Sequence, residues 1–185
     1  AVEYLVWISN NSTGQSPVVK VSVTSTSLMP SQPLGIGSYT VWVRAIGPGN
    51  QMGAWSVPLK FQITTRAVLN SLQKYVPTTQ PTFSWASLPG AVKYDLWVNN
   101  RLTDEAQVIR ETSLTGTSFT PTTPLPLGLY YAWIRASDAA GTNAAWSVPI
   151  VFYITAAPKL NGPLSPTVNV RPTFAWTSVP GAVVY

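Results

Sequence analysis

The chain has 185 residues, of which 45% are hydrophobic and only 9% are charged, and its formal net charge is +5. It contains no cysteine and no histidine, which excludes most zinc sites, thiol nucleophiles and histidine-based acid–base catalysis. The lysines and arginines are scattered along the chain, and no apolar run reaches the roughly 18 residues of a membrane-spanning helix, so neither nucleic-acid binding nor a membrane span is predicted in this segment.

The sequence repeats itself at an offset of 91 residues. PTFSWASLPGAV at 81–92 returns as PTFAWTSVPGAV at 172–183, and WSVP at 55–58 returns at 146–149. A period of this length exceeds a solenoid turn or a propeller blade and matches one small domain. We therefore predict a segment of a tandem array. Its expected domains are a partial domain at 1–65, a complete domain at 66–156 and a second partial domain at 157–185.

Within the complete repeat, short segments alternate between apolar and polar residues. Tyr94, Leu96 and Val98, with Val92 before them, are expected on a buried face, and the residues between them on the opposite face. Prolines and glycines separate the segments, and no window has helical periodicity. About seven short strands in one period predict an all-β, two-sheet antiparallel sandwich. In chain order, the expected strands are 82–85, 92–98, 107–111, 116–120, 130–136 and 150–154, with a short strand before them.

The flanking segments are predicted to hold the two complementary parts of the same sandwich. Residues 1–65 correspond to the later strands of the repeat, and residues 157–185 correspond to its first strands and the start of the next. Each part alone would expose a sheet edge and half of a core. We consider two interpretations: the parts are cuts through a continuous array, or they are strand-exchange partners that complete each other between copies.

Several residues carry a resemblance to a known family. Trp85 has the place of a buried tryptophan on the second strand, residues 90–96 look like the entry to the third, and Tyr130 heads the pattern Tyr-x-Ala-x-Ile-x-Ala. Residues 39–45 repeat that pattern one period earlier. The unit resembles a bacterial fibronectin type III domain of the kind strung along large extracellular or cell-surface proteins. The resemblance implies that Tyr130 is a corner tyrosine, although the stretch before it is one residue shorter than usual.

Tryptophan is abundant, and its positions fall into two groups. Trp85 and Trp176 are expected in the core. The others alternate away from the core, next to arginines, in an arrangement that resembles the stacked Trp–Arg ladder of cytokine-receptor modules. We interpret this strip in three ways: a surface for glycans or aromatic ligands, cation–π stacking that stiffens a sheet, or a lateral interface between arrays. Its members are Trp7, Trp42, Arg44, Trp55, Trp97, Trp133, Arg135 and Trp146.

The acidic residues predict no catalytic or metal site. The chain has six of them, no acidic pair recurs in both repeats, and the junctions between repeats carry none. Paired carboxylates for hydrolysis and the clustered carboxylates of a linker calcium site are therefore not expected. We predict no catalytic residue, no metal and no cofactor, and hence no enzyme. Asn10 and Asn11 each begin a glycosylation sequon in an expected turn.

These observations predict a non-catalytic structural repeat of a bacterial extracellular fibre, stalk or surface protein. Its modules would stack end to end and assemble into filaments by strand complementation, with neighbouring copies or adjacent repeats as partners. The alternative is a glycan-binding or adhesion module of a secreted polysaccharide-active protein or adhesin that uses the exposed Trp/Arg strip. Both functions depend on analogy with a fold that hosts many functions.

Overall fold

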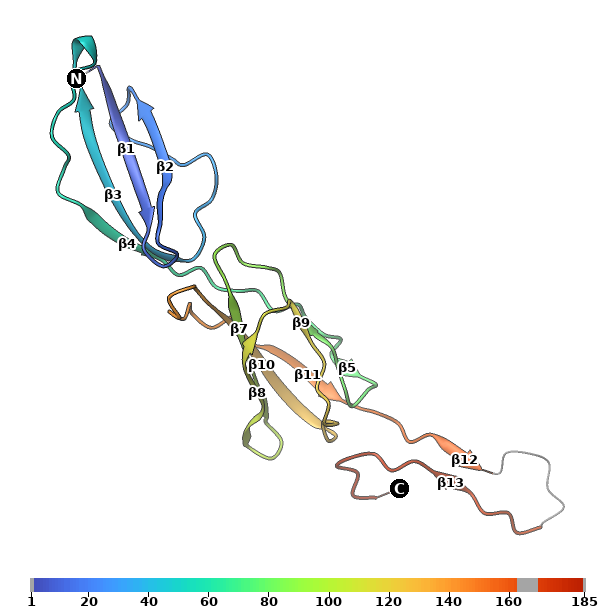
Figure 1. Ribbon diagram of the computed structural model, residues 1–185. Coiled ribbons are helices and arrows are strands. Elements are labelled where there is room, and N and C mark those ends of the chain that lie inside the picture. The colour runs from blue at the N-terminus through green and yellow to red at the C-terminus, as the bar shows by residue number, and fades with distance from the viewer. Residues whose placement is uncertain (1, 163–169, 185) are drawn as a thin grey trace. The chain divides into compact units, whose positions relative to one another are not determined.

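The computed structural model describes residues 2–162 and 170–184 (Figure 1). They form two compact units. Unit 1 comprises Ala1–Ala67, Ser87–Asp95 and Arg135–Trp146, and unit 2 comprises Val68–Ala86, Leu96–Ile134 and Ser147–Tyr185. Apart from one 3-10 turn, η1 (Pro48–Asn50), the regular structure of the described residues is entirely β, as predicted. No helix in this part of the chain is long and apolar enough to cross a membrane.

Unit 1 contains a four-stranded antiparallel sheet in the order β2-β1-β3-β4 (Figure 1). Trp7 on β1 lies opposite Trp42 on β3 and opposite Lys20 on β2, so these side chains share one face. The other face carries a small core of Val6, Ile8 and Tyr39. The strands are β1 (Glu3–Asn10), β2 (Gln15–Val23), β3 (Gly37–Ile46) and β4 (Leu59–Ile63).

A five-stranded sheet in the order β5-β11-β10-β7-β8 comes from the complete repeat. In this sheet β10 pairs with β11 antiparallel, whereas β5 pairs with β11 in parallel. Its β7 and β10 run through both units. The strands are β5 (Tyr75–Val76), β7 (Lys93–Asn100), β8 (Glu105–Leu114), β10 (Gly128–Ser137) and β11 (Ile150–Ile154).

The second layer of the sandwich is narrow. In unit 2, β6 (Phe83–Ser84) pairs with β9 (Ser118–Phe119), and Leu69 forms an isolated bridge to Trp85. The ring of Phe83 meets the ring of Phe152 on β11 at 5.7 Å, edge to face. The two layers therefore enclose one apolar core. The two layers have the strand pairing of a fibronectin type III-like sandwich, as the sequence predicts. The fully buried side chains of the core are Phe83, Leu96, Val98, Tyr130, Ala132, Ile134 and Phe152.

Several predicted details needed correction. The strand expected at 107–111 extends over Glu105–Leu114, and the one expected at 116–120 is only Ser118–Phe119. Val92, expected on the buried face, precedes β7 and is exposed. Its N–H donates to the carbonyl of Ser137 at 2.9 Å, which holds the backbone in place without burying the side chain.

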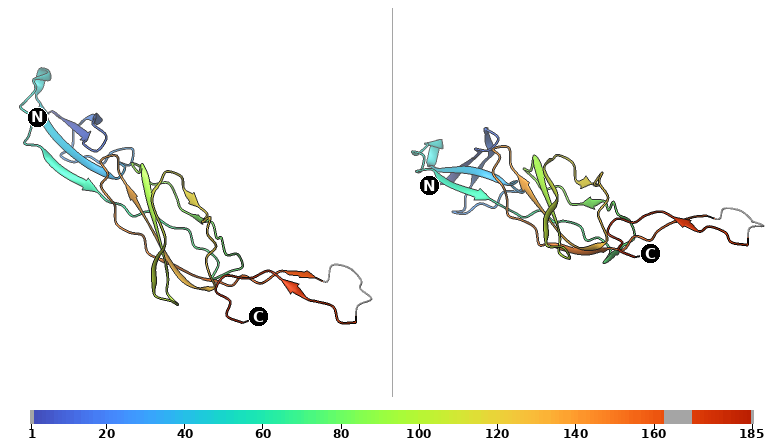
Figure 2. Two further views of the ribbon diagram at one scale, coloured as in Figure 1. Left: turned by 60° about the horizontal axis from the view of Figure 1, so that its bottom comes forward. Right: turned by 90° about the horizontal axis from the view of Figure 1, so that it is seen from below.

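The segment that follows β11 forms a narrow ladder of β12 (Leu160–Gly162) and β13 (Ala175–Trp176), which run side by side in Figure 2. Its large apolar side chains are exposed. Trp176, expected in the core, is 44% exposed, whereas Trp85 one repeat earlier is 3% exposed. The prediction for Trp176 was therefore wrong for this structure, because no apolar layer comparable to that over Trp85 covers it.

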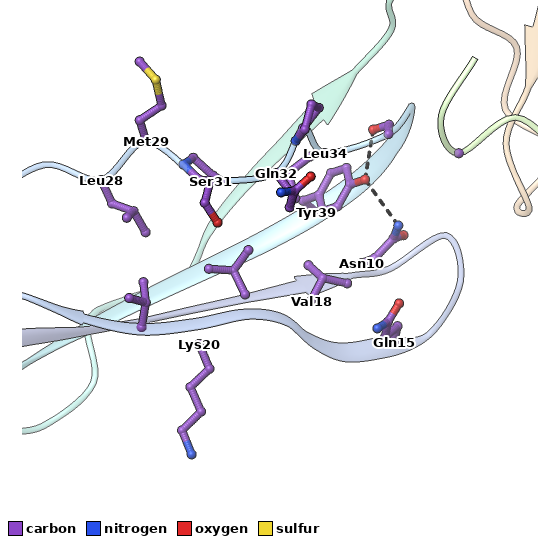
Figure 3. A pocket seen from close by; sticks show the side chains of 16 residues that line it. Asn10, Gln15, Val18, Lys20, Leu28, Met29, Ser31, Gln32, Leu34 and Tyr39 are labelled. Carbon is purple, nitrogen blue, oxygen red and sulfur yellow. Dashed lines mark hydrogen bonds between the residues drawn. The ribbon is translucent and has the colours of Figure 1, made fainter. Parts of the chain in front are cut away.

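The corner tyrosine is present in both repeats. The hydroxyl of Tyr130 donates to the carbonyl of Pro126 at 2.9 Å, so the short stretch before it does not prevent the bond. The hydroxyl of Tyr39 donates to the carbonyl of Gly35 at the same distance, and it accepts a bond from the Asn10 amide at 3.3 Å (Figure 3). Each bond ties a strand to the backbone four residues before the tyrosine.

Candidate functional sites

Three tryptophans form a pocket on the outer face of the unit 1 sheet. Cross-strand register places Trp7 opposite Trp42, and Trp55 comes from the segment between η1 and β4. The rings of Trp7 and Trp55 meet edge to face at 6.3 Å. The pocket has a volume of about 360 Å³ and is lined by Trp7, Trp42, Trp55 and Ser56. Its wall is therefore almost wholly aromatic, as ligand pockets commonly are.

Polar groups hold these indoles in place. The indole N–H of Trp7 lies 3.2 Å from the hydroxyls of both Ser9 and Ser16. Ser56 fixes the Trp55 segment to β3, because its N–H donates to the Val43 carbonyl at 2.8 Å and its hydroxyl accepts from the Val43 N–H. Such bonds limit the rotamers that the rings can adopt, which favours a preformed site.

Two cations stand over this cluster. The Lys20 ammonium lies 5.4 Å from the centre of the Trp7 ring, and the Arg44 guanidinium lies 4.5 Å from the centre of the Trp55 ring. Both distances are within the range of a cation–π contact. Stacking of arginine on tryptophan, one of the three interpretations of the strip, is thus present in the structure.

In the complete repeat, the corresponding aromatic residues have additional partners. Within unit 2, the Trp97 and Trp133 rings are 6.1 Å apart, and the Arg110 guanidinium is 4.9 Å from the Trp97 ring centre. Tyr131 contacts Trp133 at 6.0 Å, and Arg101 lies 5.6 Å from the Tyr131 ring centre.

Within unit 1, Arg135 connects an aromatic ring to a carboxylate. Its guanidinium lies 4.4 Å from the centre of the Trp146 ring, and both its Nε and Nη2 donate to one oxygen of Asp95 at 2.9 Å. Asp95 is 3% exposed, so this is a largely buried, charge-assisted pair.

The eight predicted strip residues therefore form several local groups. Sequence reasoning missed Lys20, Arg110, Tyr131 and Asp95, all of which contact the strip. Alternation along one strand gives the face of a residue, but a partner on the next strand depends on register. The one sequence signal for these residues is that strand alternation places them on the same outward face as the strip.

The opposite face of the unit 1 sheet presents an apolar surface. A groove of about 530 Å³ runs over it, lined by residues that include Val6, Ile8, Val41, Val43, Leu59 and Phe61. A second groove, of about 670 Å³, lies between β2 and the segment at 28–35. In Figure 3, Leu28 and Leu34 lie on one side of this groove and Val18 on the other, while Lys20 points away.

The same face is fully covered in the complete repeat. Val43 is 38% exposed, whereas Ile134, its counterpart one period later, is 0% exposed. The Tyr39–Phe61 stack, at 5.3 Å and 16°, reproduces the Tyr130–Phe152 stack at 5.5 Å and 17°. In unit 2 a third ring, Phe83, closes that stack. The first sheet thus has the geometry of a half-sandwich.

Metal ions and asparagine-linked glycans have few candidate sites among the described residues. Over residues 2–162 and 170–184, no three or more Asp or Glu side chains gather where they could hold a metal ion. Asn10 is buried, with its side-chain oxygen bound to the N–H groups of Ser12 and Thr13. Asn11 is exposed in the turn after β1, so it is the more accessible of the two sequons.

Comparisons with known proteins give matches in structure but none to a family model or to a curated protein. The chain is similar to a fibronectin type III-like protein from Clostridium thermocellum, at 18% identity and a TM-score of 0.40, over 51% of this chain and 96% of that one. It is also similar to the FN1–FN3 domains of chicken CNTN1, at 16% identity and a TM-score of 0.40, over 82% of this chain and 53% of that one. Likeness at these values says nothing about function, and the assignment of the fold depends on the sheets described above.

Proposed function

We propose that the chain is a non-catalytic structural segment of an extracellular or cell-surface protein, of bacterial type, whose sandwich repeats follow one another end to end. In this proposal, each sandwich is completed by strands from a neighbouring repeat, and copies of the chain assemble into filaments in this way. The observation that carries the proposal is the apolar face of the unit 1 sheet, whose equivalent in the complete repeat is fully buried.

The segment at 157–185 has the sequence that fits this face. Its Leu160, Phe174 and Trp176 are the counterparts of Leu69, Phe83 and Trp85, which cover the core of the complete repeat. Phe174 is 61% exposed and Phe83 is 0% exposed. Phe174 of a second copy would supply the third ring beside Tyr39 and Phe61. Burying large aromatic side chains of this kind stabilises association by roughly 1.5–3 kcal/mol each.

The composition is compatible with close association. Only 9% of the residues are charged, so few like charges would face each other when copies approach. The mode of association is β-strand addition, in which main-chain bonds give affinity and side-chain pockets give register.

Sedimentation of the full chain across a range of concentrations tests the proposal. We expect wild type to form oligomers. Phe174→Asp should raise the concentration needed for half of the chains to associate by at least about tenfold, because a charge would enter an apolar groove. Val183→Asp is the matched control. Val183 is exposed, and so is its counterpart Val92, so association should persist.

A wild-type chain that remains monomeric at every concentration would contradict the assembly. Association of Phe174→Asp equal to that of wild type would contradict the proposed contact. Electron microscopy of the associated fraction would then distinguish filaments from closed oligomers, which a head-to-tail contact also permits.

The pocket of Trp7, Trp42 and Trp55 favours glycan binding as a second candidate function. The electron-rich faces of indole rings attract polarised C–H groups such as those of a sugar ring. We expect Trp55→Ala to release the chain from insoluble polysaccharides such as cellulose or chitin, and Val57→Ala, at a nearby exposed side chain, to leave binding intact. If wild type binds neither cellulose nor chitin, glycan binding of this kind is contradicted.

A further inference from the structure

The same backbone contact occurs once in each compact unit, and its two instances are one sequence period apart. In unit 1, the N–H of Ile36 donates to the carbonyl of Pro89 at 2.8 Å. In unit 2, the N–H of Leu127 donates to the carbonyl of Pro180, also at 2.8 Å. The donors are counterparts in the 91-residue repeat, and so are the acceptors. An accidental contact would not be expected to recur at both partners.

Glycine permits the approach on the turn side of the contact. A Cβ atom at Gly90 would lie 2.5 Å from the Ile36 carbonyl oxygen and 2.8 Å from its nitrogen. A Cβ atom at Gly181 would lie 2.9 Å from the Leu127 nitrogen. Both glycines also have a positive φ, at +82° and +80°, which side-chain-bearing residues rarely adopt. The Pro-Gly turn can therefore seat only when its second residue lacks a side chain.

The donor side is fixed by the corner tyrosines. Tyr39 binds the carbonyl of Gly35, directly before Ile36, and Tyr130 binds the carbonyl of Pro126, directly before Leu127. Figure 3 shows the bonds of the Tyr39 hydroxyl at this end of β3. Each tyrosine holds the segment that presents the donating N–H, which favours a corner preorganised for the turn.

In each unit, one residue at this contact is buried. Ile36 is buried. Val179, directly before Pro180, is also buried, although nearly all of the described residues from 170 to 184 are exposed. The turn at 179–181 is therefore docked, whereas the strand before it is not.

Unit 1 has one more contact at this place. The Ser12 hydroxyl donates to a carboxylate oxygen of Asp138 at 2.7 Å, and the Ser38 N–H donates to the Ser12 hydroxyl at 2.9 Å. The other oxygen of Asp138 accepts from the N–H groups of Ala140 and Thr142. Asp138 is buried, and a buried carboxylate with this set of donors is a directional, satisfied group.

We infer that the tyrosine corner of each repeat is a docking surface for the Pro-Gly turn of the repeat that follows it. This turn–corner contact would couple successive repeats at a defined position and in one direction along the chain. The inference builds on the proposed end-to-end order of repeats, and it adds the surface and the partner segment that enforce this order. It does not require association between copies.

Amide hydrogen exchange of the full chain, followed by NMR, tests the contact at its two donors. In wild type, the Ile36 and Leu127 amides should be protected. Gly90→Ala should accelerate exchange at Ile36 by about tenfold and leave Leu127 unchanged, and Gly181→Ala should do the reverse. Each variant is thus a control for the other.

Gly141→Ala controls for backbone strain. Gly141 has φ +80° like the two turn glycines, but a Cβ there would meet no atom within 4 Å. This variant should leave both amides protected. Free exchange at Ile36 and Leu127 in wild type, or an effect of Gly90→Ala that is absent or equal at both corners, would overturn the inference. Sedimentation of the same samples reports association separately, so a monomeric chain with protected amides would refute the assembly and leave the turn–corner contact standing.

Discussion

At the scale of single residues, the corner tyrosines show how burial changes chemistry. Tyr130 is completely buried and bound to Pro126. Burial raises its pKa to about 12, the charge of Glu105 adds to this effect, and the Asn100 hydrogen bond opposes it. Burial also raises the pKa of Tyr39, with a smaller contribution from Asp138. Each hydroxyl is therefore kept neutral, as a donor to the backbone must be.

Tyr130 should make stability depend on pH in the alkaline range. Because its folded-state pKa lies above the unfolded value of about 10, its contribution is complete below about pH 10 and is lost as the pH rises towards about 12. We expect Tyr130→Phe to lower the melting temperature at neutral pH, by the loss of roughly 0.5–1.5 kcal/mol for one hydrogen bond. Thermal unfolding at several pH values checks this.

The difference in melting temperature between wild type and Tyr130→Phe should become smaller above about pH 10. A constant difference across the range would show that the hydroxyl does not titrate with unfolding. Tyr153→Phe is a suitable control, since Tyr153 is a less buried tyrosine on the adjacent strand β11.

At the scale of elements, equivalent arginines of the two main sheets have different partners. On β10, Arg135 is paired with Asp95 of β7, whereas on β3 its counterpart Arg44 lies opposite Leu5 of β1. Both arginines stack on a tryptophan. The stacking therefore does not need the carboxylate, but the buried carboxylate needs its arginine.

This asymmetry predicts unequal effects of the two single substitutions. Arg135→Leu leaves Asp95 buried and unpaired, which should destabilise by about 3–5 kcal/mol. Asp95→Leu reproduces the arrangement of the first sheet and leaves Arg135 stacked on Trp146, so its effect should be clearly smaller. Urea unfolding measures the free energy of unfolding of both variants. A larger decrease for Asp95→Leu than for Arg135→Leu would contradict this prediction.

At the scale of the whole molecule, the sequence period sets which residues can fold together. We predict that residues 66–156 expressed alone unfold in one cooperative transition, because they contain both layers around the Tyr130–Phe152 core. Residues 1–65 alone should bind a hydrophobic dye and aggregate, since the apolar groove over their sheet stays open. Calorimetry and dye fluorescence of the two fragments check this. Cooperative folding of 1–65 alone would mean that its sheet needs no second layer.

The sequence by itself determined the features that depend on local order. Period-two alternation identified the strand class and the inward phase of Tyr94, Leu96 and Val98, because neighbouring side chains on a strand must point to opposite faces. The repeated letters identified the period, and the resemblance of the Tyr-x-Ala-x-Ile pattern to that of a known family implied the corner tyrosine. Apart from the period, these features follow from residues close together in the chain.

Only the tertiary structure decided which distant residues meet. The pairing of Arg110 with Trp97 and the burial of Asp95 beside Arg135 depend on cross-strand register, which a strand's own sequence does not encode. The exposure of Trp176 depends on what covers it, not on its pattern. The turn–corner contact joins groups more than 50 residues apart through backbone atoms that every sequence possesses. Its only local trace is the glycine that lets those atoms approach.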